Sequence, residues 1–308
     1  MKKDSKIFIA GHKGMVGSAI MRELQKQGYS NIIVRTRAEL DLLNQQAVAD
    51  FFAQEKPEFV FLAAAKVGGI EANRSQLGSF TYENLQIQNN IIHNAYLNKV
   101  ERLIFLGSSC IYPKFAPQPI KEEYLLTGPL EPTNYGYAVA KIAGLKMCEA
   151  YRAQYGCDFV AVMPTNLYGI NDNFDLTTSH VLPALIRKFH EAKMRGDSAV
   201  EVWGSGTPKR ELLFVDDLAE ACVFAMNNKN VTELTNIGTG EDISIRELAE
   251  LVKKIVGFEG KIKFDTSRPD GPPRKVLDVT KINNLGWKAK TSLEEGIAKV
   301  YDWYKKNI

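Results

Sequence analysis

Short apolar runs alternate with longer helical patterns over the first half of the chain, and this alternation constrains the fold more than any other feature. The apolar runs lie at 6–10, 31–34, 58–64, 102–107 and 158–163, and the helical patterns between them at 16–27, 45–54, 81–98 and 134–154. The run Phe59-Val60-Phe61-Leu62 contains no polar residue, which is typical of a strand buried on both faces. The pattern therefore predicts an α/β fold with a doubly wound parallel sheet covered by helices.

A glycine-rich turn follows the first predicted strand. Its three glycines permit a tight turn and a close backbone approach, and the helix that begins near Val16 directs its free amide groups toward a bound phosphate. In Rossmann-type sheets, a turn of this kind between a strand and a helix binds the pyrophosphate of a dinucleotide cofactor. The candidate residues of this turn are Gly11, His12, Lys13, Gly14, Met15, Val16 and Gly17.

The second predicted strand ends in basic residues. Proteins that bind NAD usually place an acidic residue here to hold the adenosine ribose, whereas this chain has Arg35-Thr36-Arg37. Arginine suits the 2′-phosphate of NADP, and Lys13 offers a second cation. The alternative is an ordinary solvated pair of charges after a strand. We favour NADP(H) as the cofactor.

A serine, a tyrosine and a lysine are the candidates for redox chemistry. Tyr137 and Lys141 lie four residues apart on a predicted helix, so they share a face, and the charge of Lys141 is expected to lower the pKa of the phenol. Such a phenol hands a proton to an alkoxide, while Ser108 donates a hydrogen bond to the same oxygen. Alone, the pair is more often a helix surface feature, but the glycine turn favours the catalytic interpretation.

Composition and charge narrow the class of protein. A net charge of +3 over 308 residues is too small to indicate a nucleic-acid or membrane-surface partner. No apolar run approaches the roughly 18 to 20 residues that span a bilayer, and the start of the chain lacks a signal-peptide core, so we expect a cytoplasmic enzyme. The four cysteines and four histidines have neither metal-ligand nor disulfide spacing, so we expect no metal site.

The pattern changes after Pro164, where a loop-rich stretch precedes a helix from about 180 to 195 and a short strand at 200–203. We expect two domains. Residues 1–169 and 211–238 would form the Rossmann-type NADP-binding domain, and residues 170–210 and 239–308 a smaller, discontinuous mixed α/β domain that holds the substrate.

Four blocks in order along the chain carry a resemblance to a known family: 11–19, 64–70, 107–113 and 163–169. Together with Tyr137 and Lys141, they resemble the extended short-chain dehydrogenase/reductase superfamily. Within it they are most similar to the branch that converts GDP-4-keto-6-deoxy-D-mannose to GDP-L-fucose. The resemblance spans the whole chain. It implies inversion at C3 and C5 of the hexose, reduction of the C4 ketone by NADPH, and a homodimer formed through the helix 81–98 and the helix bearing Tyr137.

The same resemblance assigns the epimerisation to Cys110 and His180, one as base and the other as acid. A thiol near a lysine and a tyrosine reaches a useful fraction of thiolate, and histidine titrates near neutral pH. From the residues alone, Cys110 is also explained as a small buried residue at a strand end, and His180 as a helix cap. Ser108, Tyr137 and Lys141, which serve reduction, would also stabilise the enolate formed during epimerisation.

Further binding residues follow from the resemblance. The implied cofactor contacts beyond the glycine turn are Arg37, Asp41, Leu42, Leu106, Gly107, Ser108, Ser109, Lys141, Pro164, Thr165, Asn166, Leu167 and His180. Asp41 is equally explained as a cap of the following helix. The implied substrate contacts are Lys188, Trp203, Arg210 and Asp270. Their ordinary alternatives are solvated charges for the two cations, a core position for Trp203 and a turn for Asp270.

Two alternatives to this function remain open. Another nucleotide-sugar 4-epimerase or 4-ketoreductase of the superfamily would share the fold and cofactor, but it would not need both Cys110 and His180. A non-catalytic, NADP-sensing regulator would not need the intact set of Ser108, Tyr137 and Lys141.

Overall fold

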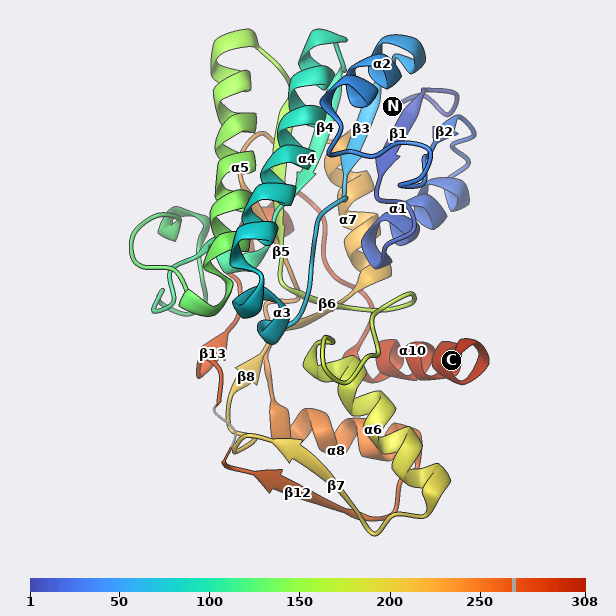
Figure 1. The fold of residues 1–308 in the computed structure, drawn as a ribbon, viewed down its shortest axis with the longest axis vertical. Coiled ribbons are helices and arrows are strands. Elements are labelled where there is room, and N and C mark those ends of the chain that lie inside the picture. The colour runs from blue at the N-terminus through green and yellow to red at the C-terminus, as the bar shows by residue number, and fades with distance from the viewer. Residues whose placement is uncertain (268–269) are drawn as a thin grey trace.

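Six parallel strands form the central sheet of the computed structural model, which describes residues 1–267 and 270–308 (Figure 1). The strands follow one another across the sheet in the order β10-β5-β4-β3-β1-β2. Their bounds are Ile7–Ala10 for β1, Ile32–Ile33 for β2, Phe59–Leu62 for β3, Arg102–Leu106 for β4, Phe159–Pro164 for β5 and Thr235–Ile237 for β10. The order reverses at the β1–β3 boundary, where ligands bind outside the carboxyl ends of the strands. The predicted doubly wound α/β sheet is confirmed.

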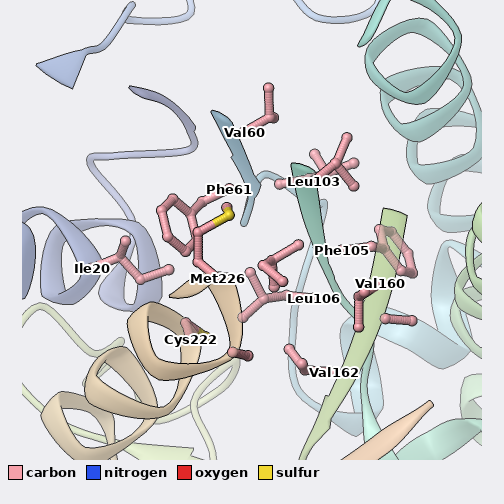
Figure 2. Close-up of a cluster of buried hydrophobic side chains, with 14 of the residues drawn as sticks. Ile20, Val60, Phe61, Leu103, Phe105, Leu106, Val160, Val162, Cys222 and Met226 are labelled. Atoms are coloured by element: carbon pink, nitrogen blue, oxygen red, sulfur yellow. The ribbon is translucent and has the colours of Figure 1, made fainter. Parts of the chain in front are cut away.

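Helices cover both faces of this sheet (Figure 1). The helices α2 (Gln45–Glu55), α4 (Leu77–Leu97) and α5 (Tyr135–Tyr155) pack together on one face, and α1 (Met15–Lys26) packs against α7 (Val215–Asn227) on the other. Figure 2 shows Cys222 and Met226 of α7 beside Phe61 of β3 and Leu106 of β4. Full burial of such a side chain contributes about 1.5–3 kcal/mol, so this core fixes the strands whose carboxyl ends carry the site.

A second, smaller core lies in the carboxyl half of the chain. Here β7 (Ala199–Trp203) pairs in parallel with β12 (Lys261–Asp265), and α6 (Val181–Arg195), α8 (Ile245–Val256) and α10 (Leu293–Asn307) supply most of its buried side chains. Helix α8 begins with a reciprocal capping box between Ser244 and Glu247 and ends at Gly257 in the left-handed region. Such caps define both ends of an exposed helix.

Very short strands connect the two cores. The strand β6 (Asn166–Tyr168) pairs with β9 (Leu212–Phe214), and β8 (Lys209–Arg210) lies between β11 (Ile243–Ser244) and β13 (Arg274–Lys275). The remaining elements of the described residues are α3 (Ile70–Ser75), α9 (Thr280–Asn284), and three single turns of 3₁₀ helix, η1 (Ser109–Ile111), η2 (Glu122–Tyr124) and η3 (Pro132–Asn134). Several side chains between 277 and 287, a stretch that we expected in the smaller domain, pack into the larger core.

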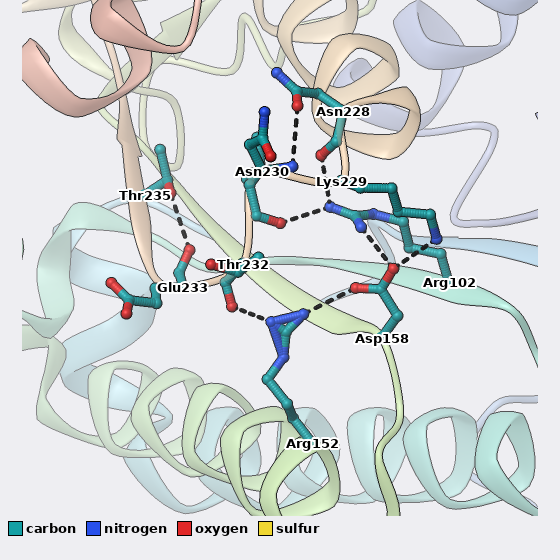
Figure 3. Close-up of polar contacts among 10 residues, drawn as sticks. Arg102, Arg152, Asp158, Asn228, Lys229, Asn230, Thr232, Glu233 and Thr235 are labelled. Carbon is teal, nitrogen blue, oxygen red and sulfur yellow. Dashed lines mark hydrogen bonds and ion pairs between the residues drawn. The ribbon is translucent and has the colours of Figure 1, made fainter.

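A buried ionic network lies at the amino ends of β4 and β5 (Figure 3). The guanidinium of Arg102, which is 0% exposed, donates to Asp158 at 2.6 Å and to the carbonyl oxygens of Val231 at 2.6 Å and Asn228 at 3.1 Å. Asp158 also accepts from Arg152 and Lys229.

Within the described ranges, no helix is both long enough and apolar enough to cross a membrane.

Candidate active site

The glycine-rich turn lies at the carboxyl end of β1, against the end of β3. Gly11 has a φ of +93°, and a Cβ there would lie 2.8 Å from the amide nitrogen of Ala64. A Cβ on Gly17 would overlap the carbonyl oxygen of Gly11. Helix α1 starts at Met15 without a side-chain cap on Gly14, so its first amide groups keep their hydrogen-bonding capacity. The turn is therefore a backbone cradle of the kind that binds a phosphate group.

Basic side chains gather beyond this cradle at the end of β2. Arg35 is engaged within the protein, because its guanidinium donates to Glu55 at 2.6 Å and to the carbonyl of Val34 at 2.9 Å. Arg37 and Lys13 are exposed. A backbone hydrogen bond from Thr36 lowers the pKa of the neighbouring Glu39, and the charges of Arg35 and Lys13 add to that effect. Lys13 and Arg37 are thus the cations available to a ligand here.

Asp41 does not cap the helix that follows it. Its Oδ1 accepts from the amide of Leu43 at 3.1 Å, whereas the cap of α2 is Asn44, whose side chain accepts from Ala47. The capping alternative for Asp41 is therefore wrong, because the capping position of the helix lies three residues later, at Asn44.

Tyr137 and Lys141 lie on one face of α5, beside the end of β4. The side chain of Lys141 is 4% exposed, its Nζ donates to the carbonyl of Leu106 at 2.7 Å, and the same Nζ lies 5.7 Å from the centroid of the Tyr137 ring. Ser108 stands immediately before η1 and hydrogen-bonds to the Tyr137 side chain. The three residues that we expected to act together are therefore neighbours.

The expected lowering of the Tyr137 pKa is not found. Burial raises the pKa of Tyr137, the negative charge of Cys110 raises it further, and only the hydrogen bond with Ser108 lowers it. Burial also lowers the pKa of Lys141 to about 8. The spacing of four residues fixed a shared helix face, but the ammonium of Lys141 binds the Leu106 carbonyl. Tyr137 is consequently a neutral phenol, able to donate a proton.

Cys110 and His180 lie within electrostatic reach of one lysine, Lys275. Cys110 is 8% exposed in η1, and burial raises the pKa of its thiol, whereas the charges of Lys275 and Lys141 and a hydrogen bond with Ser108 lower it. His180 occupies the position before α6 without capping it through its side chain, so the capping alternative is wrong. Its imidazole is solvent-accessible, yet desolvation and the charge of Lys275 lower its pKa, which favours the neutral form.

Other predicted cofactor contacts stand at the carboxyl ends of neighbouring strands. Leu106 ends β4, and Gly107 and Ser109 follow it. The amide of Thr165, after β5, donates to the carbonyl of Ile237 of β10 at 3.0 Å. Asn166 of β6 donates through its side chain to the carbonyl of Glu211 at 2.9 Å. Because parallel strands end at one edge, the fold collects these segments beside the glycine turn.

The four predicted substrate contacts belong to the part of the chain around the smaller core. Lys188 of α6 lies 5.0 Å from the centroid of the Trp203 ring and donates to the carbonyl of Glu201. Trp203 is 54% exposed, so the core alternative for it is wrong. Asp270 accepts from the amide and hydroxyl of Ser205. Arg210 donates to the carbonyl of Pro272 at 2.6 Å; burial lowers the pKa of its guanidinium and the charge of Asp270 raises it.

Two residues of this region were missed in the sequence, Lys275 and the fully buried Glu211. Neither has a local signal, because β13 meets β8 only through a pairing between residues 65 apart, Lys275 and Arg210. As for metals, the described residues contain no group of three or more His, Cys, Asp or Glu side chains that could hold an ion.

Comparison with known proteins adds to this geometry. The model of the NAD dependent epimerase/dehydratase family matches residues 7–238, about three quarters of the chain. GDP-L-fucose synthase 1 of Arabidopsis thaliana is 60% identical over 99% of this chain and 95% of its own. GDP-L-fucose synthase of Escherichia coli is 54% identical over 98% and 97%. Among solved structures, the GDP-mannoheptose C4 reductase of Campylobacter jejuni with NADP bound is 48% identical, with a TM-score of 0.91 over 99% of both chains.

Proposed function

Since this chain belongs to the NAD dependent epimerase/dehydratase family, we propose that it converts GDP-4-keto-6-deoxy-D-mannose to GDP-L-fucose with NADPH as reductant. The observation that carries the proposal is the identity of 54–60% to two GDP-L-fucose synthases over nearly the full length of each protein. The neighbouring positions of Ser108, Tyr137 and Lys141, and the shared electrostatic environment of Cys110 and His180, support it.

The residues fit an NADP molecule. The cradle at Gly11 and Gly17, which any Cβ would fill, suits the pyrophosphate, and the exposed Lys13 and Arg37 suit a 2′-phosphate. The segments 106–109 and 164–167 would line the nicotinamide half. NADPH, when bound, supplies the hydride that reduces the ketone.

Proton transfer by the chain's own residues explains the two stages. Removing a proton beside a ketone leaves an enolate, which needs hydrogen-bond donors on its oxygen, and Ser108 and Tyr137 are suited to that task. Inversion requires a base on one face of the sugar ring and an acid on the other, for which we propose Cys110 and His180. In the reduction, the neutral phenol of Tyr137 then gives its proton to the C4 oxygen.

The substrate contacts follow from the second half of the chain. Lys188 and Arg210 provide cations for the diphosphate, and the exposed ring of Trp203 provides a stacking face for guanine or sugar. Asp270 would position this region by holding the Ser205 turn. We also propose the division into an NADP-binding domain of 1–169 and 211–238 and a substrate domain of 170–210 and 239–308, with several side chains of the second part at 277–287 packing into the larger core.

Assembly and location are further parts of the proposal. Tyr82, Leu97, Tyr135 and Tyr155, on or beside the packed pair α4 and α5, are large and exposed, which supports pairing of two copies through these helices in a cytoplasmic homodimer. Light scattering after size exclusion should give about twice the chain mass of 34.4 kDa. A species of only one chain mass would reject the dimer.

A second candidate function is reduction at C4 of a different GDP-linked sugar without epimerisation. It is favoured by one observation, the 48% identity to a GDP-mannoheptose C4 reductase over almost the whole chain.

Isotope exchange separates the two candidates. The enzyme is incubated with GDP-4-keto-6-deoxy-D-mannose in heavy water, first without and then with NADPH. Deuterium at C3 and C5 without NADPH, followed by NADPH oxidation and GDP-L-fucose formation, is the expected result. Cys110→Ser should abolish the exchange, while the matched control Cys157→Ser should leave it intact. NADPH oxidation without exchange would favour the plain reductase, and no turnover would reject this sugar.

A further inference from the structure

Lys275 lies on a short strand that is fixed on both sides. In β13 it pairs in parallel register with Arg210 of β8, and its carbonyl accepts from the amide of Glu211 at 3.1 Å. The next residue, Val276, donates its amide to the side chain of Gln118 at 2.9 Å and accepts from the amide of Ile120 at 2.8 Å. The segment 118–120 comes after η1, which contains Cys110, along the chain. The backbone around Lys275 is therefore bonded to β8, which carries Arg210, on one side and to the segment 118–120 on the other.

Glu211 holds this strand in place through its side chain. It is 0% exposed, and its Oε2 accepts from the amide of Leu277 at 2.8 Å. Its Oε1 accepts from the amides of Thr239 at 2.7 Å and Gly240 at 2.8 Å. Each oxygen of this buried carboxylate accepts at least one amide hydrogen bond, and none of these bonds comes from the Lys275 ammonium. Glu211 thus fixes the backbone around Lys275, while its charge acts on the ammonium without a direct bond.

The side chain of Lys275 differs from that of its neighbour. Successive side chains of a strand point to opposite faces, and Arg274 is exposed and paired with Asp242. Lys275 is half-buried, and among the residues that the structure describes its ammonium makes neither a hydrogen bond nor an ion pair. Burying an unpaired charge is unfavourable, and here it lowers the pKa of Lys275. Such a cost at a candidate site indicates a functional role.

The charged and titratable groups around Lys275 are those of the site. Cys110, His180, Arg210 and Glu211 all interact with it electrostatically. The groups that face Cys110 itself are Lys275, Lys141, Ser108 and Tyr137. Of the two lysines, Lys141 donates a hydrogen bond to the Leu106 carbonyl. The ammonium of Lys275 makes no hydrogen bond with any residue that the structure describes.

We propose that Lys275 is a further positioning residue of this site, held by Glu211, whose ammonium favours the thiolate form of Cys110. In the reaction the thiolate accepts the proton beside the ketone, so an S–H bond forms, a C–H bond breaks and the electron pair moves to the carbonyl oxygen. The role in catalysis rests on the proposed function, but the effect of Lys275 on Cys110 does not.

Alkylation of the free enzyme tests the inference without any sugar. Iodoacetamide reacts with thiolate, forming an S–C bond and releasing iodide, and mass spectrometry of the Cys110 peptide gives its rate at each pH. In Lys275→Met the midpoint of this titration should move up by about one pH unit. Lys275→Arg should stay near wild type, because it keeps the charge. Cys157, whose pKa is raised by burial alone, is an internal reference that should not change.

The outcomes separate this role from others. Lys275→Gln is measured in parallel, so that a folding failure of one variant does not decide the question, and circular dichroism checks each fold. An unchanged Cys110 titration in a folded Met or Gln variant would overturn the inference, whether or not the enzyme turns over its sugar. If GDP affinity falls while the titration stays, Lys275 serves only as a diphosphate contact, and the inference is again wrong.

Discussion

Replacing Arg102 by methionine should destabilise the protein, because three acceptors depend on one fully buried guanidinium (Figure 3). The carbonyls of Asn228 and Val231 would lose their side-chain donor, at about 1 kcal/mol each. Asp158 would lose one of its three cations but keep Arg152 and Lys229. The stability lost at Asp158 should therefore stay well below the roughly 3–5 kcal/mol that breaking an isolated buried pair costs. The apolar packing of the methionine side chain offsets part of this cost. We therefore expect the free energy of unfolding to fall by about 2–3 kcal/mol.

Calorimetry measures this loss as a change in melting temperature. With an unfolding entropy of roughly 2.1 cal/mol/K per residue over 308 residues, each kcal/mol corresponds to about 1.5 °C, so Arg102→Met should melt about 3–5 °C lower. The matched control is Lys229→Met, which removes an exposed cation from the same carboxylate and should cost less than about 1 kcal/mol. If Arg102→Met melts within 1 °C of wild type, the reasoning from buried acceptors is refuted.

The pH dependence of the same variant provides a second check. Burial alone would raise the pKa of Asp158, but its bonds to Lys229 and Arg152 and the charge of Arg102 outweigh this and lower it. A carboxylate with a lowered pKa in the folded state stabilises the protein above its unfolded pKa of about 3.9, and that contribution is lost as the pH falls below it. The difference between wild type and Arg102→Met should therefore shrink in acid.

Three further predictions concern the site. Tyr137→Phe should lower kcat for ketone reduction by about 10²–10⁴-fold with NADPH affinity unchanged, as fluorescence titration of NADPH would check; retained kcat would remove Tyr137 as the proton donor. Gly17→Ala places a Cβ on the Gly11 carbonyl and should weaken NADPH binding at least tenfold, whereas the control Gly78→Ala, with open space around it, should not. Lys141 loses its proton as the pH rises through about 8, so kcat/KM should fall across that range, and a flat profile up to pH 10 would contradict its role.

The sequence predicted the central sheet because its signals are local. Each of the first five strands is a short apolar run, and each helix between them has the expected period, so β3 at Phe59–Leu62 and α5 at Tyr135–Tyr155 fall close to the predicted ranges. The two-residue strands β8, β11 and β13 have no such signal, since they exist only through pairing with distant segments. Element type could therefore be read from periodicity, and the connections between the two cores could not.

The sequence predicted that some side chains of the candidate site are neighbours, but it did not predict their electrostatics. A spacing of four residues correctly put Tyr137 and Lys141 on one helix face, yet the direction of the Tyr137 pKa depends on burial and on where the ammonium points. Lys275 was missed for a related reason, because its strand β13 forms only by pairing with the distant β8, and its electrostatic effect on Cys110 leaves no signal along the chain. Spacing along the chain gives a side chain its face, whereas the pKa follows from surroundings that only the fold supplies.

Arg102 is a fully buried cation and Lys275 a half-buried one, and their roles differ: the first stabilises the fold, and we propose that the second acts on Cys110. Arg102, at the amino ends of the strands, has its charge matched by Asp158 and two carbonyls, whereas Lys275, near Cys110, has no partner within the described structure. A lysine whose folded pKa is lowered destabilises the folded state below that pKa, and the penalty disappears as the pH rises through its unfolded value of about 10.4. Lys275→Met should therefore melt at a higher temperature than wild type at pH 7, whereas Arg102→Met should melt at a lower one. At the same time, Cys110 of Lys275→Met should react more slowly with iodoacetamide. A lower melting temperature for Lys275→Met would mean that its ammonium stabilises the fold, and the cost that we attribute to function would not exist.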